Sequence, residues 1–288
     1  MVRRIADRLV NVDPRLIYLL FAVVLAVAAT RPIRGLPAPS PATEEVFAKV
    51  ASLAPGSTLV MGFEFGSQSE GEVAEQAAAM LRHALSRNLK VVGIALTRGG
   101  EGSAEELFRR ILAEYPGKSY GTDVVNLGFR SGGVAYLHAL AWDLRGVTLG
   151  VDGYGTDLAG MAAVGGLSGL SDVSLVAVFA PEWQVVKDYI AVIRDALGLP
   201  LVAGSTSMGS VRLAPLVTQG RLDGMLDGLR GAAEYEVLSG ITAEGVHGLQ
   251  VVAVIVPFLA MLTLAGFVSY TLSTRRMLEL ERGARPSF

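Results

Sequence analysis

The segment Gly128–Gly133, with the sequence GFRSGG, combines small residues with one cation in a pattern suited to binding an anion. Glycine lets the backbone approach a ligand closely, and backbone N–H groups at the start of a helix favour negative charge. The alternative is that these glycines serve only a tight turn and close helix packing. The segment is neither a P-loop nor a dinucleotide fingerprint. Its candidate ligand-binding residues are Gly128, Arg130, Ser131, Gly132 and Gly133.

A second segment, Gly204–Gly209 (GSTSMG), superficially looks like the turn that carries the nucleophilic serine of α/β-hydrolases. That turn reads G-x-S-x-G, and serine occupies position 205, where the pattern around Ser207 needs glycine. A catalytic serine also needs a histidine base, and none of the three histidines is expected beside this segment: His83, His138 and His247. We interpret Ser205 and Ser207 as candidate ligand contacts, with capping of the following helix as the alternative.

Two glutamates, Glu64 and Glu182, each follow an apolar run that is typical of a buried strand. A carboxylate pair can perform acid–base chemistry or bind a hard cation, whereas a single acidic residue at a loop start is more often solvated. We add Glu64 and Ser67, in one loop, to the candidate ligand-binding residues. Segment 150–157 is rich in Gly and Asp but lacks the spacing of a calcium loop, so no metal site is predicted. The sequence identifies no cofactor.

Composition narrows the functional classes. Of the 288 residues, 51% are hydrophobic and 18% charged, and the mean hydropathy of +0.45 is high for a soluble domain. Disorder is excluded as the main state, because ample apolar surface can be buried. A net charge of -2 leaves no basic excess, so nucleic acid is not an expected partner. The absence of cysteine excludes disulfides and thiolate metal sites.

Two uncharged apolar runs predict membrane segments. Leu16–Ala29 is shorter than the about 20 residues that cross a bilayer, and several arginines precede it. We expect an uncleaved signal anchor over residues 16–30; cleavage after Ala28 and a buried core helix are the alternatives. The second run, residues 251–272, is long enough to span. Because arginines flank both runs on their outer sides, both termini are expected to be cytoplasmic and residues 31–250 extracytoplasmic.

The remaining chain divides by composition. We expect, in order, a cytoplasmic tail at 1–15, the first membrane helix at 16–30, a Pro-rich spacer with a short helix at 31–56, an α/β domain at 57–240, a juxtamembrane linker at 241–250, the second membrane helix at 251–272 and a basic cytoplasmic tail at 273–288.

The middle of the chain alternates apolar strand-like runs with amphipathic helical patterns. Strands are expected at 57–63, 89–96, 123–127, 174–180, 199–203 and 222–226. Runs without polar alternation indicate strands buried on both faces, as in a parallel sheet. We therefore predict a doubly wound, mostly parallel Rossmann-like sheet of five or six strands, flanked by an N-terminal and a C-terminal transmembrane helix. A Ser103/Glu106 capping box predicts one helix start, and residues 146–171 read as a long loop.

Three short patterns carry a resemblance: Val125–Phe129, the pair Gly132-Gly133, and Gly231–Glu236. With them, the middle domain resembles bacterial membrane-anchored α/β proteins of no assigned function. The resemblance transfers no catalytic residue. The plan of one span at each end and an α/β domain outside is also similar to auxiliary subunits of ABC-type exporters.

Three functions follow as hypotheses. The first is a non-catalytic accessory or scaffold subunit of a membrane complex, with the lipid bilayer and other membrane subunits, or a second copy, as partners. The second is a ligand-binding or sensing module. The third is a membrane-anchored hydrolase or transferase. In an open parallel sheet, ligands bind beyond the carboxyl ends of the strands, so the candidate residues are expected along one edge.

Overall fold

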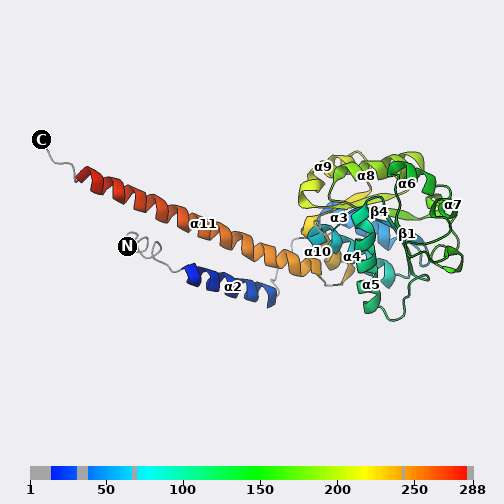
Figure 1. Cartoon of the computed structure of the whole chain (residues 1–288), viewed down its shortest axis with the longest axis horizontal. Coiled ribbons are helices and arrows are strands. Elements are labelled where there is room, and N and C mark those ends of the chain that lie inside the picture. The colour runs from blue at the N-terminus through cyan, green and yellow to red at the C-terminus, as the bar shows by residue number, and fades with distance from the viewer. Residues whose placement is uncertain (1–13, 31–37, 67–69, 242–243, 284–288) are drawn as a thin grey trace. The chain divides into compact units, whose positions relative to one another are not determined.

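A computed structural model describes residues 14–30, 38–66, 70–241 and 244–283. Several expected segments lie partly outside these ranges: residues 1–13 of the first tail, 31–37 of the Pro-rich spacer, Ser67 in its loop, 242–243 of the linker and 284–288 of the last tail. The chain divides into two compact units. One is Leu36–Val246, and the other contains the apolar helix α2 (Pro14–Thr30) and helix α11 (Glu244–Gly283) from His247 onward (Figure 1).

The larger unit is built on a six-stranded sheet in the order β3-β2-β1-β4-β5-β6, and every neighbouring pair is parallel. This confirms the α/β class and the Rossmann-like parallel sheet. The strands are β1 (Thr58–Phe63), β2 (Lys90–Ala95), β3 (Val124–Phe129), β4 (Leu175–Phe179), β5 (Leu201–Ser205) and β6 (Gly224–Asp227).

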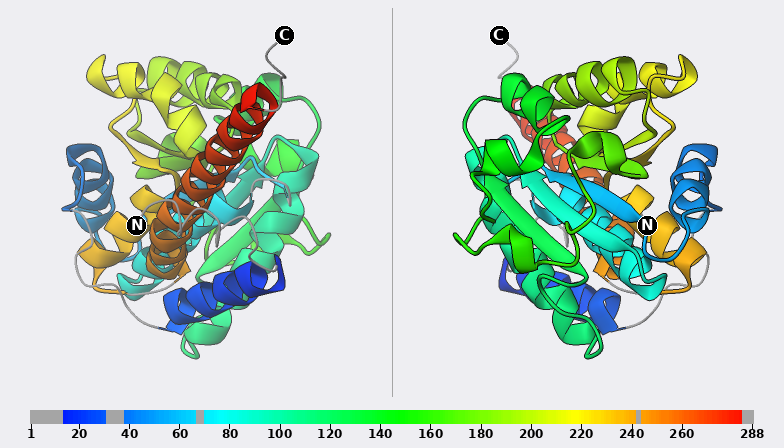
Figure 2. Two further views of the ribbon diagram at one scale, coloured as in Figure 1. Left: turned by 90° about the vertical axis from the view of Figure 1, so that its left-hand side faces the viewer. Right: turned by 90° about the vertical axis from the view of Figure 1, so that its right-hand side faces the viewer.

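Helices cover both faces of the sheet, which explains why its strands are apolar without alternation (Figure 2). One face packs against α3 (Pro41–Ala51), α4 (Glu70–Ser86), α5 (Arg98–Glu114) and α10 (Gly228–Ser239). The other packs against α6 (Val134–Leu140), α7 (Leu144–Thr148), α8 (Trp183–Tyr189) with its continuation η3 (Ile190–Ala196), and α9 (Ser207–Thr218). Short turns η1 (Leu158–Gly160) and η2 (Leu170–Asp172) interrupt the long loop.

Helix α5 begins five residues before the predicted capping box, so that prediction is wrong. Ser103 lies inside the helix, and its hydroxyl donates to the carbonyl oxygens of Phe65 and Gly99. The first turn fits because it is made of glycine: a Cβ at Gly100 would collide with the Phe63 carbonyl, and one at Gly99 would lie 3.0 Å from the Cα of Gly66. Close backbone packing, and not the cap, therefore decides where α5 starts.

Strand β5 is shifted by two residues from its predicted place. Gly198, with φ of 67°, ends the preceding helix, and the strand begins at Leu201. Ser205 is consequently the last residue of the strand and is fully buried.

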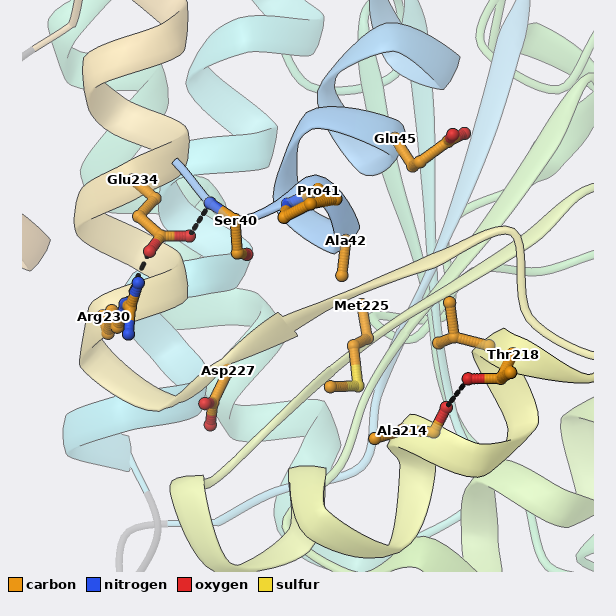
Figure 3. A pocket seen from close by; sticks show the side chains of 11 residues that line it. Ser40, Pro41, Ala42, Glu45, Ala214, Thr218, Met225, Asp227, Arg230 and Glu234 are labelled. Atoms are coloured by element: carbon orange, nitrogen blue, oxygen red, sulfur yellow. Dashed lines mark hydrogen bonds and ion pairs between the residues drawn. The ribbon is translucent and has the colours of Figure 1, made fainter. Parts of the chain in front are cut away.

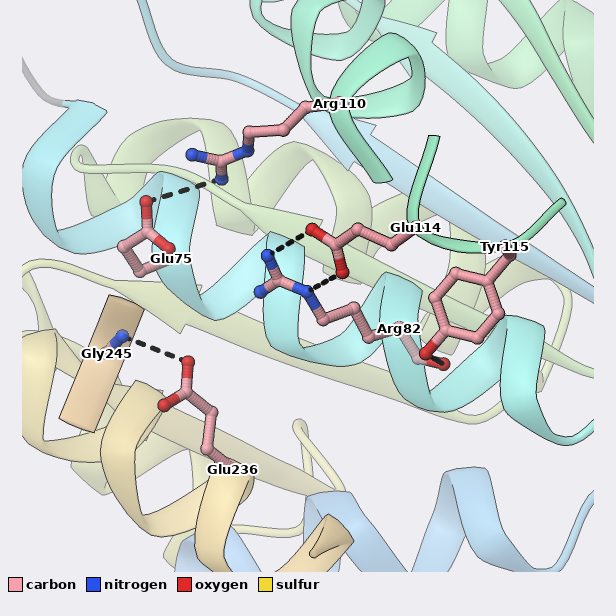
Figure 4. Close-up of polar contacts among 7 residues, drawn as sticks. All are labelled: Glu75, Arg82, Arg110, Glu114, Tyr115, Glu236 and Gly245. Carbon is pink, nitrogen blue, oxygen red and sulfur yellow. Dashed lines mark hydrogen bonds and ion pairs between the residues drawn. The ribbon is translucent and has the colours of Figure 1, made fainter. Parts of the chain in front are cut away.

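Two ion pairs, Arg82–Glu114 and Arg110–Glu75, join α4 to α5 on one face of the sheet, and a buried carboxylate on α10 lies on the same face (Figure 4). Arg82 on α4 donates two hydrogen bonds to Glu114 on α5, at 2.7 and 2.8 Å. Glu236 on α10 is 1% exposed and accepts from the backbone N–H groups of Gly245 and Val246, both at 2.9 Å. Residues 244–246, within the expected linker, are therefore the capped first turn of α11.

Among the residues that the structure describes, one helix is long and apolar enough to cross a membrane. Its apolar stretch, Gly245–Val268, has 24 residues and includes an 18-residue segment with mean hydropathy 2.6, of which only 6% is buried. It begins before the predicted 251–272 span and continues through Pro257 without a break. The apolar part of α2, Arg15–Val27, is shorter, so a second span is not confirmed.

Candidate functional site

The sheet order places the topological switch point between β1 and β4. From β1 the chain winds outward to β2 and β3, and from β4 it winds the other way to β5 and β6. The helices leave these two strands on opposite faces, and this is where ligands bind in open parallel sheets. Glu64 directly follows β1, and its backbone N–H donates to the Phe179 carbonyl of β4 at 2.9 Å. The predicted residue Glu64 therefore lies at the switch point.

The Glu64 carboxyl is held between two elements. Its Oε1 accepts from the Tyr189 hydroxyl at 2.6 Å and from the backbone N–H of Leu96 at 2.9 Å. The side chain is 4% exposed, and this burial raises its pKa to about 7, against hydrogen bonds from Tyr189, Leu96 and Thr97 that lower it. Burial and the neighbouring carboxylate raise the pKa of Tyr189 well above its usual value, so the phenol stays a donor. Glu64 thus titrates near neutrality.

A second phenol beside this pair has no hydrogen-bond partner within the described part of the chain. Tyr136, in the first turn of α6, is 6% exposed, and its hydroxyl is buried. Burial raises its pKa to about 12, opposed by the charge of Arg130. Tyr136 and Tyr189 belong to the same buried cluster, and Tyr136 helps to raise the pKa of Tyr189. A buried hydroxyl without a partner is costly, and a bound ligand or water is the usual explanation.

Arg130 carries a charge that its contacts do not neutralise. Its guanidinium donates to the backbone carbonyl of Asp152 at 3.3 Å, and no carboxylate in the described ranges forms an ion pair with it. Ser131 and Gly132 beside it are exposed, and Gly133 caps α6 with φ of 54°. These four residues directly follow β3 at the carboxyl edge of the sheet, and Tyr136 follows them in the first turn of α6.

Gly128 has a structural role in the packing of β3 against the long loop. It lies inside β3 with φ of 74°, and a Cβ there would be 2.8 Å from the Cα of Gly153 and 2.7 Å from Oε1 of Glu101. Gly153 belongs to the long loop that covers the edge of β3, where its N–H donates to Asn126 at 2.8 Å. For Gly128, these contacts support the packing interpretation of the glycines.

The segment 150–157 is organised by a carboxylate turn. Asp152 is 1% exposed and accepts from the backbone N–H groups of Tyr154 and Thr156 and from the Tyr120 hydroxyl. Both of its oxygens are engaged in holding the loop against β3. This explains the Gly- and Asp-rich composition of the loop.

Ser205, at the end of β5, and Ser207, in the first turn of α9, lie away from Arg130 and Tyr136. The Ser205 hydroxyl is buried against the Pro181 carbonyl, and Ser207 binds Glu72 through its N–H at 2.8 Å and its hydroxyl at 3.2 Å. Four strand spacings separate β3 from β5, roughly 19 Å at about 4.8 Å each. A small ligand beside Arg130 therefore cannot also contact Ser207.

The histidines give no support to a serine hydrolase. His83 is packed in the core between α4, α3 and α10, with Nδ1 2.9 Å from the Tyr235 hydroxyl and its ring stacked on Phe47. Ser207 binds a carboxylate instead of an imidazole. Its hydroxyl therefore lacks the base that would activate it.

The sequence prediction missed the two tyrosines. Tyr189 lies 125 positions from Glu64 along the chain, and Tyr136 lies on a helix whose pattern reads as ordinary core. The one available signal was a tyrosine on a helix that directly follows a strand-end loop. Neither a protein-family model nor a curated protein matches this sequence.

Proposed function

We propose that the chain is a membrane-anchored α/β domain that binds a small anionic ligand at the carboxyl edge of its sheet. The observation that carries this proposal is the buried Tyr136 hydroxyl, which lacks a hydrogen-bond partner among the described residues and lies near the uncompensated charge of Arg130. An anion would accept from the phenol and offset the guanidinium charge. The exposed backbone at Gly132 lets the anion approach closely.

The test measures ligand-dependent stability of the full chain in mild detergent. Phosphate, citrate and acetate are each added at constant ionic strength against chloride, and thermal unfolding is followed by tryptophan fluorescence. At least one anion is expected to raise the midpoint, with the effect lost in Arg130→Gln and in Tyr136→Phe. Arg145→Gln, which changes an exposed arginine on α7, is the matched control and keeps the effect. Equal stabilisation in all variants would contradict the proposal.

The anchor in this proposal consists of α11 and of α2 as an uncleaved signal anchor, with both termini cytoplasmic and the α/β domain outside. The apolar stretch Gly245–Val268 supports one span directly, and the arginines outside each apolar run support the orientation. Because the chain has no cysteine, single cysteines report topology without background. In intact expression cells an impermeant maleimide should label Ser52→Cys, and label Ser287→Cys only after permeabilisation. The reverse pattern would refute the orientation.

A second candidate is an accessory or scaffold subunit of a membrane complex. It is favoured by Met208 and Val211 on α9, which are 86% and 72% exposed and lie one turn apart on the same helix face. Mild solubilisation followed by mass spectrometry should recover a membrane protein at constant ratio. Met208→Lys should lose it, and Leu149→Lys, at an equally exposed position, should retain it. Recovery of the chain alone would leave only the ligand-binding proposal.

A further inference from the structure

A cavity lies at the β6 edge of the sheet, away from the switch point. Helix α3 covers one face of β6 and α9 the other, and between them a cavity of about 460 Å³ reaches Met225 (Figure 3). This volume is within the range of about 300–1,000 Å³ that holds small ligands. Its walls come from four elements that are distant in sequence: α3, α9, β6 and α10.

The inner surface of the cavity is apolar. Pro41 and Ala42 from α3 face Ala214 from α9, and the Met225 side chain lies between the two helices (Figure 3). Val217 of α9 also lines the cavity. A methionine sulfur makes favourable contacts with aromatic rings and adapts to their shape. The apolar walls and the thioether together suit a flat aromatic body.

The charges around the cavity sum to a negative value. Arg230 donates to Glu234 at 2.6 Å. Burial raises the pKa of Glu234, but hydrogen bonds from Ser40, Arg230 and Thr43 outweigh it and hold this pKa below its usual value. The Arg230–Glu234 pair is therefore neutral overall. Asp227 and Glu45 also line the cavity, and no Lys or Arg in the described ranges forms an ion pair with either.

Two opposing electrostatic effects act on a bound charge. The N-termini of α3 and α10 both lie at the cavity, since Asp227 is the N-cap of α10, and each carries about half a positive charge, which favours anions. The carboxylates of Asp227 and Glu45 together carry about twice the summed charge of these two helix ends, with the opposite sign. Asp227 uses one oxygen to accept from the Ser210 hydroxyl at 2.5 Å, which fixes the carboxylate in place. The net field therefore favours a cation.

We propose that this cavity binds a small organic cation with an aromatic body, the ammonium group lying against Asp227 and the ring against Met225. This site is separate from the proposed anion site, since Arg130 and Tyr136 follow β3 and β6 is the strand at the opposite edge of the sheet.

The experiment is calorimetry with the full chain in zwitterionic lipid nanodiscs, with empty nanodiscs as baseline. The probe is 2-phenylethylammonium, compared with 2-phenylethanol and phenylacetate, which keep the ring and change the charge. The cation is expected to bind, the alcohol at least tenfold more weakly, and phenylacetate not measurably. No heat for the cation, or equal affinity for the alcohol, would overturn the proposal.

Variants locate the binding. Ala214→Trp fills the cavity and should abolish binding, and Asp227→Asn should weaken it at least tenfold, as expected for a charge-assisted hydrogen bond. Glu105→Gln, an exposed carboxylate on α5, is the matched control and should keep wild-type affinity. Unchanged affinity in Ala214→Trp and in Asp227→Asn would show that the cation binds elsewhere and would overturn the assignment. If Asp227→Asn fails to fold because the Ser210 bond is lost, Ala214→Trp and the three-probe comparison still decide.

Discussion

The Glu64 carboxyl makes folding of the α/β unit depend on pH in a direction opposite to that of an ordinary carboxylate. Its pKa rises from 4.5 to about 7 on folding, so between these values the folded state holds one proton more than the unfolded state. The stability that the folded chain gains from holding this proton on Glu64 is complete below pH 4.5 and is lost as the pH rises through 7. At about 1.4 kcal/mol per pKa unit, the loss is about 3 kcal/mol.

His83 opposes this trend in the wild-type chain. Burial and the charge of Arg87 lower its pKa from 6.5 to about 4 on folding. The contribution of His83 to the free energy of unfolding is complete above pH 6.5 and is lost as the pH falls through 4. This loss is again about 3 kcal/mol. The two contributions nearly cancel between pH 4.5 and 6.5, so these two groups leave the wild type almost pH-independent there.

Glu64→Gln separates the two effects, because the amide imitates the protonated carboxyl at every pH. The variant should match the wild type near pH 4.5 and exceed its free energy of unfolding by about 3 kcal/mol at pH 7.5. His83→Gln should show the converse, a fall in stability from pH 4.5 to 7. Urea unfolding of the full chain in mild detergent measures both, since both tryptophans, Trp142 and Trp183, lie in the α/β unit and report only on it.

The control is Glu105→Gln on the exposed surface of α5, whose curve should follow the wild type. If the Glu64→Gln curve also runs parallel to the wild type from pH 4.5 to 7.5, the carboxyl does not titrate near neutrality and the reasoning fails.

Three further variants test particular contacts. Gly100→Ala should destabilise the α/β unit by more than about 3 kcal/mol, because the new Cβ collides with the Phe63 backbone; a urea midpoint close to wild type would contradict this. Glu236→Gln should cost about 1–2 kcal/mol by weakening the cap on α11, which amide exchange at Gly245 and Val246 would detect as faster exchange. Tyr136→Phe should leave the stability of the ligand-free chain equal or higher, since it removes a buried hydroxyl without a partner; a loss above about 1 kcal/mol would show that the hydroxyl is satisfied.

Local patterns in the sequence were sufficient for the class of fold. Six apolar runs separated by amphipathic helices predict a parallel sheet, because each strand is short, continuous and buried by helices on both faces. The apolar stretch of α11 is likewise visible in sequence, since its length and lack of charge are properties of the segment alone. Glu64 was found because it directly follows such a run.

Tertiary structure decided which strand ends meet. The order β3-β2-β1-β4-β5-β6 puts Glu64 beside β4 and separates Arg130 from Ser207 by four strand spacings, although both segments follow strands and both are rich in glycine and serine. The partnership of Glu64 with Tyr189 and the start of α5 at a glycine contact with Phe63 depend on residues far apart in the chain. Periodicity is a property of neighbouring residues, whereas strand order and backbone contact depend on packing between distant ones, so only the folded chain reveals them.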